Sequence, residues 1–206
     1  VLKEATGGGQ EGAEADALKV SQELKAFADI SAVSPIYADA LARRGVVNIG
    51  APFMSREWLS QRRPYTWSQF TDCSTIVESV GSYYAIKMAN RPADNAGGSL
   101  KGQPRKVGII APENSWYQEC VAAGVRILNS AGVQPVLNEK YRLEVNQMSI
   151  QAGEKLAKLK NAGVTTVVCG CDPLFMKFLT AKAKEQNAKE QEQDREQPGL
   201  RRRPHE

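Results

Sequence analysis

Hydrophobic and polar positions alternate along the chain in two ways, one typical of helices and one typical of strands. Apolar residues three or four positions apart, as in Ile76, Val80, Tyr84 and Met88, predict helices with one buried face. Short apolar runs between them predict strands. In the first half the predicted order is helix 14–26, strand 27–31, helix 35–43, strand 46–50, loop 51–64, strand 65–70 and helix 74–90. This order is typical of part of an open α/β layer.

A polar connector follows at residues 91–104, which contain two prolines and three glycines. Beyond it the predicted order is strand 107–111, helix 116–131, strand 135–139, helix 148–161, strand 164–169 and helix 173–186. The strands are apolar runs suited to burial on both faces, and each helix is long enough to cross back over a sheet. We therefore expect an α/β fold with doubly wound parallel sheets, in which 1–90 form part of a first lobe and 105–187 part of a second.

The end of the chain, residues 188–206, is predicted to be a disordered polar tail, because it contains too little apolar surface to fold. The polar sequence from Lys182 onward allows its first part to extend the last helix. The run 201–203 of three arginines is interpreted as a solvated terminus.

Composition excludes some classes of protein. The net charge is +4 and no basic stripe is interleaved with aromatic residues, so nucleic acid is not an expected partner. No apolar run approaches the roughly 20 residues of a membrane helix. The first residues, VLKEATGGGQEG, lack the charged-then-apolar order of a signal peptide.

The four cysteines do not suggest a metal site or a disulfide framework. Cys169 and Cys171 would share one face of a strand, where they are badly placed to pair with each other. The only histidine, His205, lies in the tail, so no zinc site is expected. We expect free or structural thiols, with one long-range disulfide as the alternative.

Candidate binding residues come directly after the predicted strands, because ligands of open α/β sheets gather at the carboxyl ends of the strands. The helix start at 31–34 would hold a carboxylate, and Asp172 would pair with an ammonium group. Ser34 and Asp172 have helix capping as their alternative role, and covering the sheet end is the alternative role of Trp116 and Tyr117. The candidate ligand-binding residues are Ser31, Ala32, Val33, Ser34, Phe53, Met54, Ser55, Asn114, Ser115, Trp116, Tyr117 and Asp172.

Catalytic motifs are missing from the sequence. It contains no Gly-x-Gly-x-x-Gly after a strand, no Gly-x-Ser-x-Gly elbow and no histidine placed to activate a nucleophile. The stretch GGGQEG at 7–12 lacks the Lys-Ser/Thr ending of a phosphate-binding loop. We therefore expect a protein that is not an enzyme and that uses no cofactor and no metal.

Four stretches of sequence together resemble a known family. They are ADALKVSQELKAFADISAVSPIYADALARRGVVNIGAPFMS, RRPYTWSQF, KVGIIAPENSWYQECVAAGVRILNSAGVQPV and LAKLKNAGVTTVVCGCDPLFMKFLTAKAKEQN. Their order resembles the type I periplasmic binding proteins of the branched-chain amino acid (Leu/Ile/Val) ABC transporter class, over about residues 13–187. The resemblance implies an internal segment of such a protein, with two flavodoxin-like lobes that are both incomplete.

The resemblance also implies a function. Two lobes joined by a hinge would close on a small amino-acid-like or amide solute. Residues 31–34 and 53–55 would grip its carboxylate and ammonium, while Trp116, Tyr117 and Asp172 would close over it. The partner would be the membrane permease of an ABC transporter, and the location extracytoplasmic, either periplasmic or at the cell surface.

Two alternatives stay open at this point. One is a ligand-sensing receptor domain of the same fold, which would report to a signalling partner. The other is an α/β enzyme that holds a flavin or a nucleotide at the same strand ends.

Overall fold

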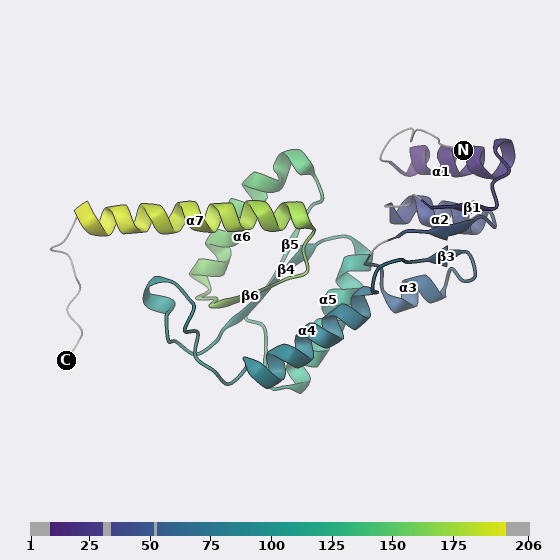
Figure 1. Cartoon of the computed structure of the whole chain (residues 1–206). Helices are drawn as coiled ribbons and strands as arrows, with labels where there is room; N and C mark the ends of the chain where they lie inside the picture. The colour runs from purple at the N-terminus through teal and green to yellow at the C-terminus, as the bar shows by residue number, and fades with distance from the viewer. Residues whose placement is uncertain (1–8, 31–33, 52, 197–206) are drawn as a thin grey trace. The chain divides into compact units, whose positions relative to one another are not determined.

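The computed structural model describes residues 9–30, 34–51 and 53–196. The chain packs into two compact units, each with a parallel three-stranded sheet and helices (Figure 1). The first unit comprises Val1–Tyr83 and Ser115–Ile127, and the second comprises Tyr84–Asn114 and Leu128–Glu206. The predicted α/β class with parallel sheets is confirmed, and each sheet is incomplete, with three strands. The lobe boundaries at 90 and 105 stay a prediction.

The sheet of the first unit has β2 at its centre. Its parallel strands follow the order β1 (Ala28–Asp29), β2 (Val47–Ile49) and β3 (Thr66–Trp67). The helices of this part are α1 (Gln10–Leu18), its π-helical continuation η1 (Lys19–Glu23), α2 (Pro35–Arg43) and α3 (Arg56–Ser60). An apolar cluster joins α1, η1 and α2 to the start of β2; its buried members are Ala17, Val20, Ala40, Leu41 and Val46.

The region predicted as the loop 51–64 contains the short helix α3. Ser55 begins this helix, because its Oγ accepts a hydrogen bond from the amide of Trp58 at 3.0 Å. The strand predicted at 65–70 is shorter than expected and ends at Trp67. Phe70 therefore lies beyond the carboxyl end of β3.

The covered face of the first sheet has a polar centre. Asn48 of β2 and Thr66 of β3 are register partners, and both are fully buried. Neither the side-chain amide of Asn48 nor the hydroxyl of Thr66 has a hydrogen-bond partner among the described residues. On the other side of Asn48, its register partner Asp29 accepts a hydrogen bond from the hydroxyl of Tyr37 at 2.8 Å. Burial, together with this hydrogen bond, raises the pKa of Tyr37.

Helices α4 (Cys73–Lys87) and α5 (Ser115–Ser130) pack closely where both belong to the first unit. A Cβ added at Gly81 would lie 2.7 Å from Cγ2 of Ile127, so glycine permits this approach. One turn earlier the helices are less close, because a Cβ added at Gly124 would lie in ordinary contact with Val77, 3.6 Å from its Cβ. The two helices thus run alongside each other over small residues.

The expected free thiols are a wrong prediction, because all four cysteines are in disulfides. Cys73 and Cys120 join the packed starts of α4 and α5, with their Cα atoms 5.9 Å apart, which is the long-range alternative. Cys169 and Cys171 pair with each other, with Cα atoms 5.0 Å apart. Two residues on one face of a strand are badly placed to pair, but this does not apply to Cys169 and Cys171. β6 ends at Cys169, and Cys171 lies in the following turn.

The second unit is built on β4 (Val107–Pro112), which is buried at every residue. It lies between β5 (Leu137–Tyr141) and β6 (Thr166–Cys169), both parallel to it. The other elements are α6 (Met148–Asn161), α7 (Pro173–Glu196) and the 3-10 turns η2 (Gly98–Leu100) and η3 (Val145–Gln147). Both α6 and α7 cover one face of this sheet; the core there is Ile110, Tyr141, Met148, Ala152, Phe175 and Leu179.

The ends of two elements differ from expectation. β5 begins two residues later than the predicted strand 135–139. α7 continues to Glu196, so 188–196 are helical although the sequence predicts a disordered tail there. The segment consists mostly of Glu, Gln, Lys and Ala, which are good helix formers even without a buried face. Residues 197–206 lie outside the described part. None of the described helices is both long and apolar enough to cross a membrane.

Glu139 of β5 forms ion pairs with two lysines of α6, and we expect these pairs to make a measurable contribution to stability. Its carboxylate accepts hydrogen bonds from Lys155 at 2.8 Å and Lys158 at 3.1 Å. Burial alone would raise the pKa of Glu139, but the two lysines outweigh it and hold the pKa below its ordinary value of 4.5. The charged form is therefore favoured by folding, and this stabilisation is present above pH 4.5 and lost as the pH falls through the lowered pKa.

We expect Glu139→Gln to lower the free energy of unfolding at pH 7 by about 1 kcal/mol, measured by urea titration. The difference from the unmodified chain should disappear as the pH is taken well below 4.5. Glu144→Gln is the matched control, because its pair with Arg142 is exposed and separated by 3.5 Å. An E139Q effect that is the same at all pH values would contradict the electrostatic explanation.

Candidate functional site

Among the candidate residues that follow strands of the first unit, Ser34 comes after β1, and Phe53, Met54 and Ser55 come after β2. Ser34 caps α2, and its Oγ accepts a hydrogen bond from the amide of Tyr37 at 3.4 Å. Its role as a cap, one of the two roles weighed for it, is thus present in the structure. The other three candidates of this segment, Ser31, Ala32 and Val33, lie outside the described residues.

Met54 and Ser55, after β2, are buried rather than open to solvent. Met54 belongs to a cluster with Ala38, Ala51 and Trp58, and Trp116 from α5 packs against the same cluster. The structure therefore brings these two candidates, Met54 and Trp116, together through apolar packing.

A hydrogen bond also crosses from the end of β2 to α5. The hydroxyl of Ser55 donates to Oε2 of Glu119 at 2.6 Å, while the same oxygen of Ser55 caps α3. Glu119 was not among the predicted residues. It lies one turn inside a helix, and a glutamate at such a position is ordinarily expected to point into solvent. The bond fixes the start of α3 against α5 within the first unit.

Phe53 is the exposed candidate of this group. Its ring stacks on that of Phe70, with 5.6 Å between the ring centroids. The two side chains are 41% and 49% exposed, so the pair presents an aromatic surface after β2 and β3. Phe70 was missed by sequence reasoning, because the predicted strand placed it within the sheet. Its position beside a turn-rich segment, SQFTD, was the available signal.

The backbone that carries Phe53 is strained. The φ angles of Ala51 and Phe53 are 38° and 63°, in the left-handed region that residues other than glycine rarely adopt. Such conformations cost about 1–3 kcal/mol each and concentrate at ligand-binding sites. Two in one turn at a strand end are typical of a functional segment.

In the second unit, Asn114 and Asp172 follow β4 and β6. Oδ1 of Asn114 is buried and has no hydrogen-bond partner among the described residues. Asp172 is the N-cap of α7, because its Oδ1 accepts hydrogen bonds from the amides of Leu174 and Phe175 at 2.9 and 3.0 Å. Its Oδ2 accepts a hydrogen bond from the hydroxyl of Tyr141 at 2.6 Å. The capping role weighed for Asp172 is therefore present, and pairing with an ammonium stays a prediction.

The remaining candidates, Ser115 and Tyr117, stand with Trp116 in the first turn of α5. Ser115 is exposed and Tyr117 is half-buried. Their predicted contact with a ligand stays a prediction.

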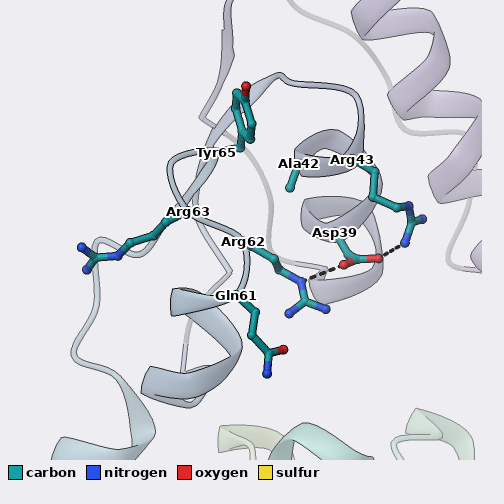
Figure 2. Close-up of a pocket in the computed structure, with 7 residues that line it drawn as sticks. All are labelled: Asp39, Ala42, Arg43, Gln61, Arg62, Arg63 and Tyr65. Atoms are coloured by element: carbon teal, nitrogen blue, oxygen red, sulfur yellow. Dashed lines mark hydrogen bonds and ion pairs between the residues drawn. The ribbon is translucent and has the colours of Figure 1, made fainter.

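A surface hollow of about 350 Å³ lies elsewhere in the first unit (Figure 2). It lies beside the residues that lead into β3, at the amino-terminal end of this strand. The candidate residues described above follow the carboxyl ends of the strands instead. Its lining residues are Asp39, Ala42, Arg43, Gln61, Arg62, Arg63 and Tyr65.

Ion pairs hold the lining of this hollow in place. Oδ1 of Asp39 accepts a hydrogen bond from Nε of Arg62 at 2.7 Å, and the other oxygen pairs with Arg43. Arg62 also lies over the ring of Trp58 at 3.9 Å. In Figure 2 the side chain of Arg63 points away from Asp39 rather than toward it. Arg43 and Arg62 are both bound to Asp39 and Arg63 points away, so the hollow does not gather its three guanidinium groups around a free space.

Metal ligands do not gather in the described part of the chain. No group of three or more His, Cys, Asp or Glu side chains is placed there to hold a metal ion. The chemistry that the strand ends offer is aromatic contact, hydroxyl groups and backbone amides at helix starts. Such groups suit the binding of a small organic molecule.

Comparisons with known proteins show the fold. No protein-family model and no curated protein matches the chain. Among solved structures it is similar to the solute-binding protein of an ABC transporter from Rhodopseudomonas palustris in complex with 4-hydroxybenzoate, with a TM-score of 0.69 and 13% identity over 92% of this chain and 47% of that one.

Two further structures are similar. One is a solute-binding protein from Rhodopseudomonas palustris BisB5 in complex with 3,4-dihydroxybenzoic acid, with a TM-score of 0.64 and 14% identity over 91% of this chain and 48% of that one. The other is a substrate-binding protein from Desulfitobacterium hafniense in complex with Leu, with a TM-score of 0.56 and 13% identity over 92% and 51% of the two chains. The chain spans about half the length of these proteins. The fold is that of the type I periplasmic binding protein lobes.

Proposed function

We propose that the chain is the ligand-binding part of a solute-binding protein of an ABC transporter. In this proposal two lobes close by hinge motion on a small solute, and the protein catalyses no reaction. A membrane permease as partner and an extracytoplasmic location belong to the same proposal. It is supported by the fold and by the placement of the candidate residues at strand ends.

The observation that carries the proposal is the exposed pair of Phe53 and Phe70. Large aromatic rings usually bury most of their surface, but here two are stacked on each other and left open beside a strained turn. Folding alone gains little from this arrangement. Ligand pockets are lined mainly by apolar and aromatic side chains with a few polar groups, and a ring bound against this pair would gain that contact.

The solute that fits this surface best is a small organic acid with an aromatic ring. Aromatic rings stack in offset or edge-to-face arrangements worth about 0.5–1.5 kcal/mol beyond the area that they bury. The similar structures contain aromatic acids in two cases and leucine in one. The amino-acid-like or amide solute expected from the sequence is the second choice.

The test is a titration of the purified chain with 4-hydroxybenzoate, benzoate and leucine, followed by thermal shift and calorimetry. We expect an aromatic acid to raise the melting temperature, and Phe70→Ala to raise its Kd about tenfold. Phe70 is chosen because its replacement leaves the strained backbone at Phe53 intact.

Phe27→Ala is the matched control. Phe27 is 84% exposed and lies just before β1, so it is at the amino-terminal end of the strands, whereas Phe53 and Phe70 follow their carboxyl ends. Its loss should therefore leave the Kd unchanged. A larger shift with leucine would move the proposal to amino acids. No shift with any of the three acids in a cooperatively folded chain would overturn the proposed solute class.

A further inference from the structure

The turn Cys169-Gly170-Cys171 differs from the other disulfide of the chain in its surroundings. Cys73 and Cys120 are both buried, and their bond closes a separation of 47 residues. Cys169 and Cys171 are only half-buried, with the exposed Gly170 between them, and they are two residues apart. A bond across so short a loop restricts the unfolded chain little, so it adds little stability.

The structure holds both sides of this turn in place without the disulfide. Cys169 is the register partner of Ile110 in the central strand β4, and the amide of Gly170 donates to the carbonyl of Ile110 at 2.9 Å. On the other side, Asp172 is bound to Tyr141 by two hydrogen bonds, of 2.6 and 3.0 Å. The two cysteines would therefore stay close together after reduction. Such preorganisation favours closing the bond again.

The place of the turn in the fold also suits exchange chemistry. Cys171 stands directly before Asp172, the N-cap of the 24-residue helix α7, and follows a parallel strand. Asp172 already accepts the amide hydrogen bonds at the start of α7, so Cys171 lies outside the first turn of the helix. Exchange is favoured instead because both cysteines are only half-buried, and a thiolate, the attacking and the leaving group of thiol–disulfide exchange, must reach the bond from solvent.

From these observations we propose that Cys169 and Cys171 form a thiol–disulfide exchange site for a low-molecular-weight thiol, while Cys73–Cys120 is a structural bond. The thiolate of the small thiol attacks Sγ of Cys169, the bond between the two protein sulfurs breaks, and Cys171 leaves as a thiolate just before α7. A second molecule of the small thiol then attacks the sulfur of the first.

This second step releases the disulfide of the small thiol and leaves Cys169 reduced. In sum, two small thiols lose two electrons and two protons, and the two cysteines of the protein gain them. The reverse sequence restores the Cys169–Cys171 bond. No metal or further oxidant enters the cycle.

The experiment exposes the folded, air-oxidised full chain to increasing concentrations of reduced glutathione, blocks free thiols with N-ethylmaleimide and locates the label by mass spectrometry. We expect Cys169 and Cys171 to be labelled at a glutathione concentration about tenfold or more below that needed for Cys73 and Cys120. The buried pair in the same molecule is the internal control.

Trapping the intermediate gives a second readout. In Cys171→Ser the resolving thiol is missing, so oxidised glutathione should leave a stable mixed disulfide on Cys169. Reduction of both pairs at the same concentration would overturn the proposal. So would labelling of Cys169 and Cys171 in the oxidised chain before any glutathione is added, because the two would then not be joined.

Discussion

Replacing Cys73 and Cys120 together by alanine is expected to lower the free energy of unfolding by about 4 kcal/mol. The two residues are 47 positions apart, and a bond across such a loop removes much of the conformational freedom of the unfolded chain. The same bond joins the starts of α4 and α5, two helices that pack closely further along their length, where Gly81 lies against Ile127. Urea unfolding of both chains, followed by tryptophan fluorescence, measures the loss.

The control is Cys169→Ala combined with Cys171→Ala. In the chain-entropy account a separation of two residues gives a stabilisation of only roughly 1.5 kcal/mol. We therefore expect the first double variant to lose at least twice as much stability as the second. Equal losses would show that the loop between Cys73 and Cys120 is already restricted in the unfolded chain, and no loss would mean that the bond is not formed.

Much of the fold could be predicted because long helices have a clear apolar period. α6 has the predicted bounds, Met148–Asn161, and α2 begins at Pro35 as expected. The buried strand β4 lies in the apolar run in which it was predicted, extended by one residue. These elements are specified locally, by spacing, caps and proline, and tertiary contacts only confirm them.

Short elements and cysteine pairs could not be predicted in the same way. α3 has five residues, fewer than two turns, so no apolar period exists to be recognised. The pairing of Cys73 with Cys120 depends on where α4 and α5 approach each other, which is a property of the packed chain. For Cys169 and Cys171 the decisive fact was where β6 ends, and strand ends are the least certain part of a prediction from sequence.

The candidate site shows the same division. Capping by Ser34 and Asp172 was foreseen as one of two roles, because Ser and Asp before a Pro-started helix are a local signal. Phe70 was not foreseen, because its exposure depends on the early end of β3. The buried side-chain amide of Asn48, which has no hydrogen-bond partner in the described part of the chain, was also missed, because the apolar run around it predicts a strand of ordinary composition.

Replacing Phe175 by alanine is expected to lower the free energy of unfolding by about 4 kcal/mol. Phe175 is 0% exposed and stacks on Tyr141, with 3.6 Å between the ring centroids and 13° between the ring planes. Its removal would leave a cavity at the point where α7 meets the sheet of the second unit. The expected sum includes the lost transfer energy, the cavity and the aromatic pair. Urea unfolding at pH 7 measures it.

The neighbouring Met176 supplies the control, because its side chain is 39% exposed and Met176→Ala should cost less than about 1 kcal/mol. The comparison also tests how Asp172 is held. Tyr141 binds Asp172 through its hydroxyl and packs on Phe175 through its ring, so a cavity at Phe175 should loosen the cap of α7 as well. If F175A instead cost no more than M176A, the core of the second unit would close around the cavity. The position of Asp172, next to Cys171, would then be fixed by its hydrogen bonds to Tyr141 and not by the packing of Phe175.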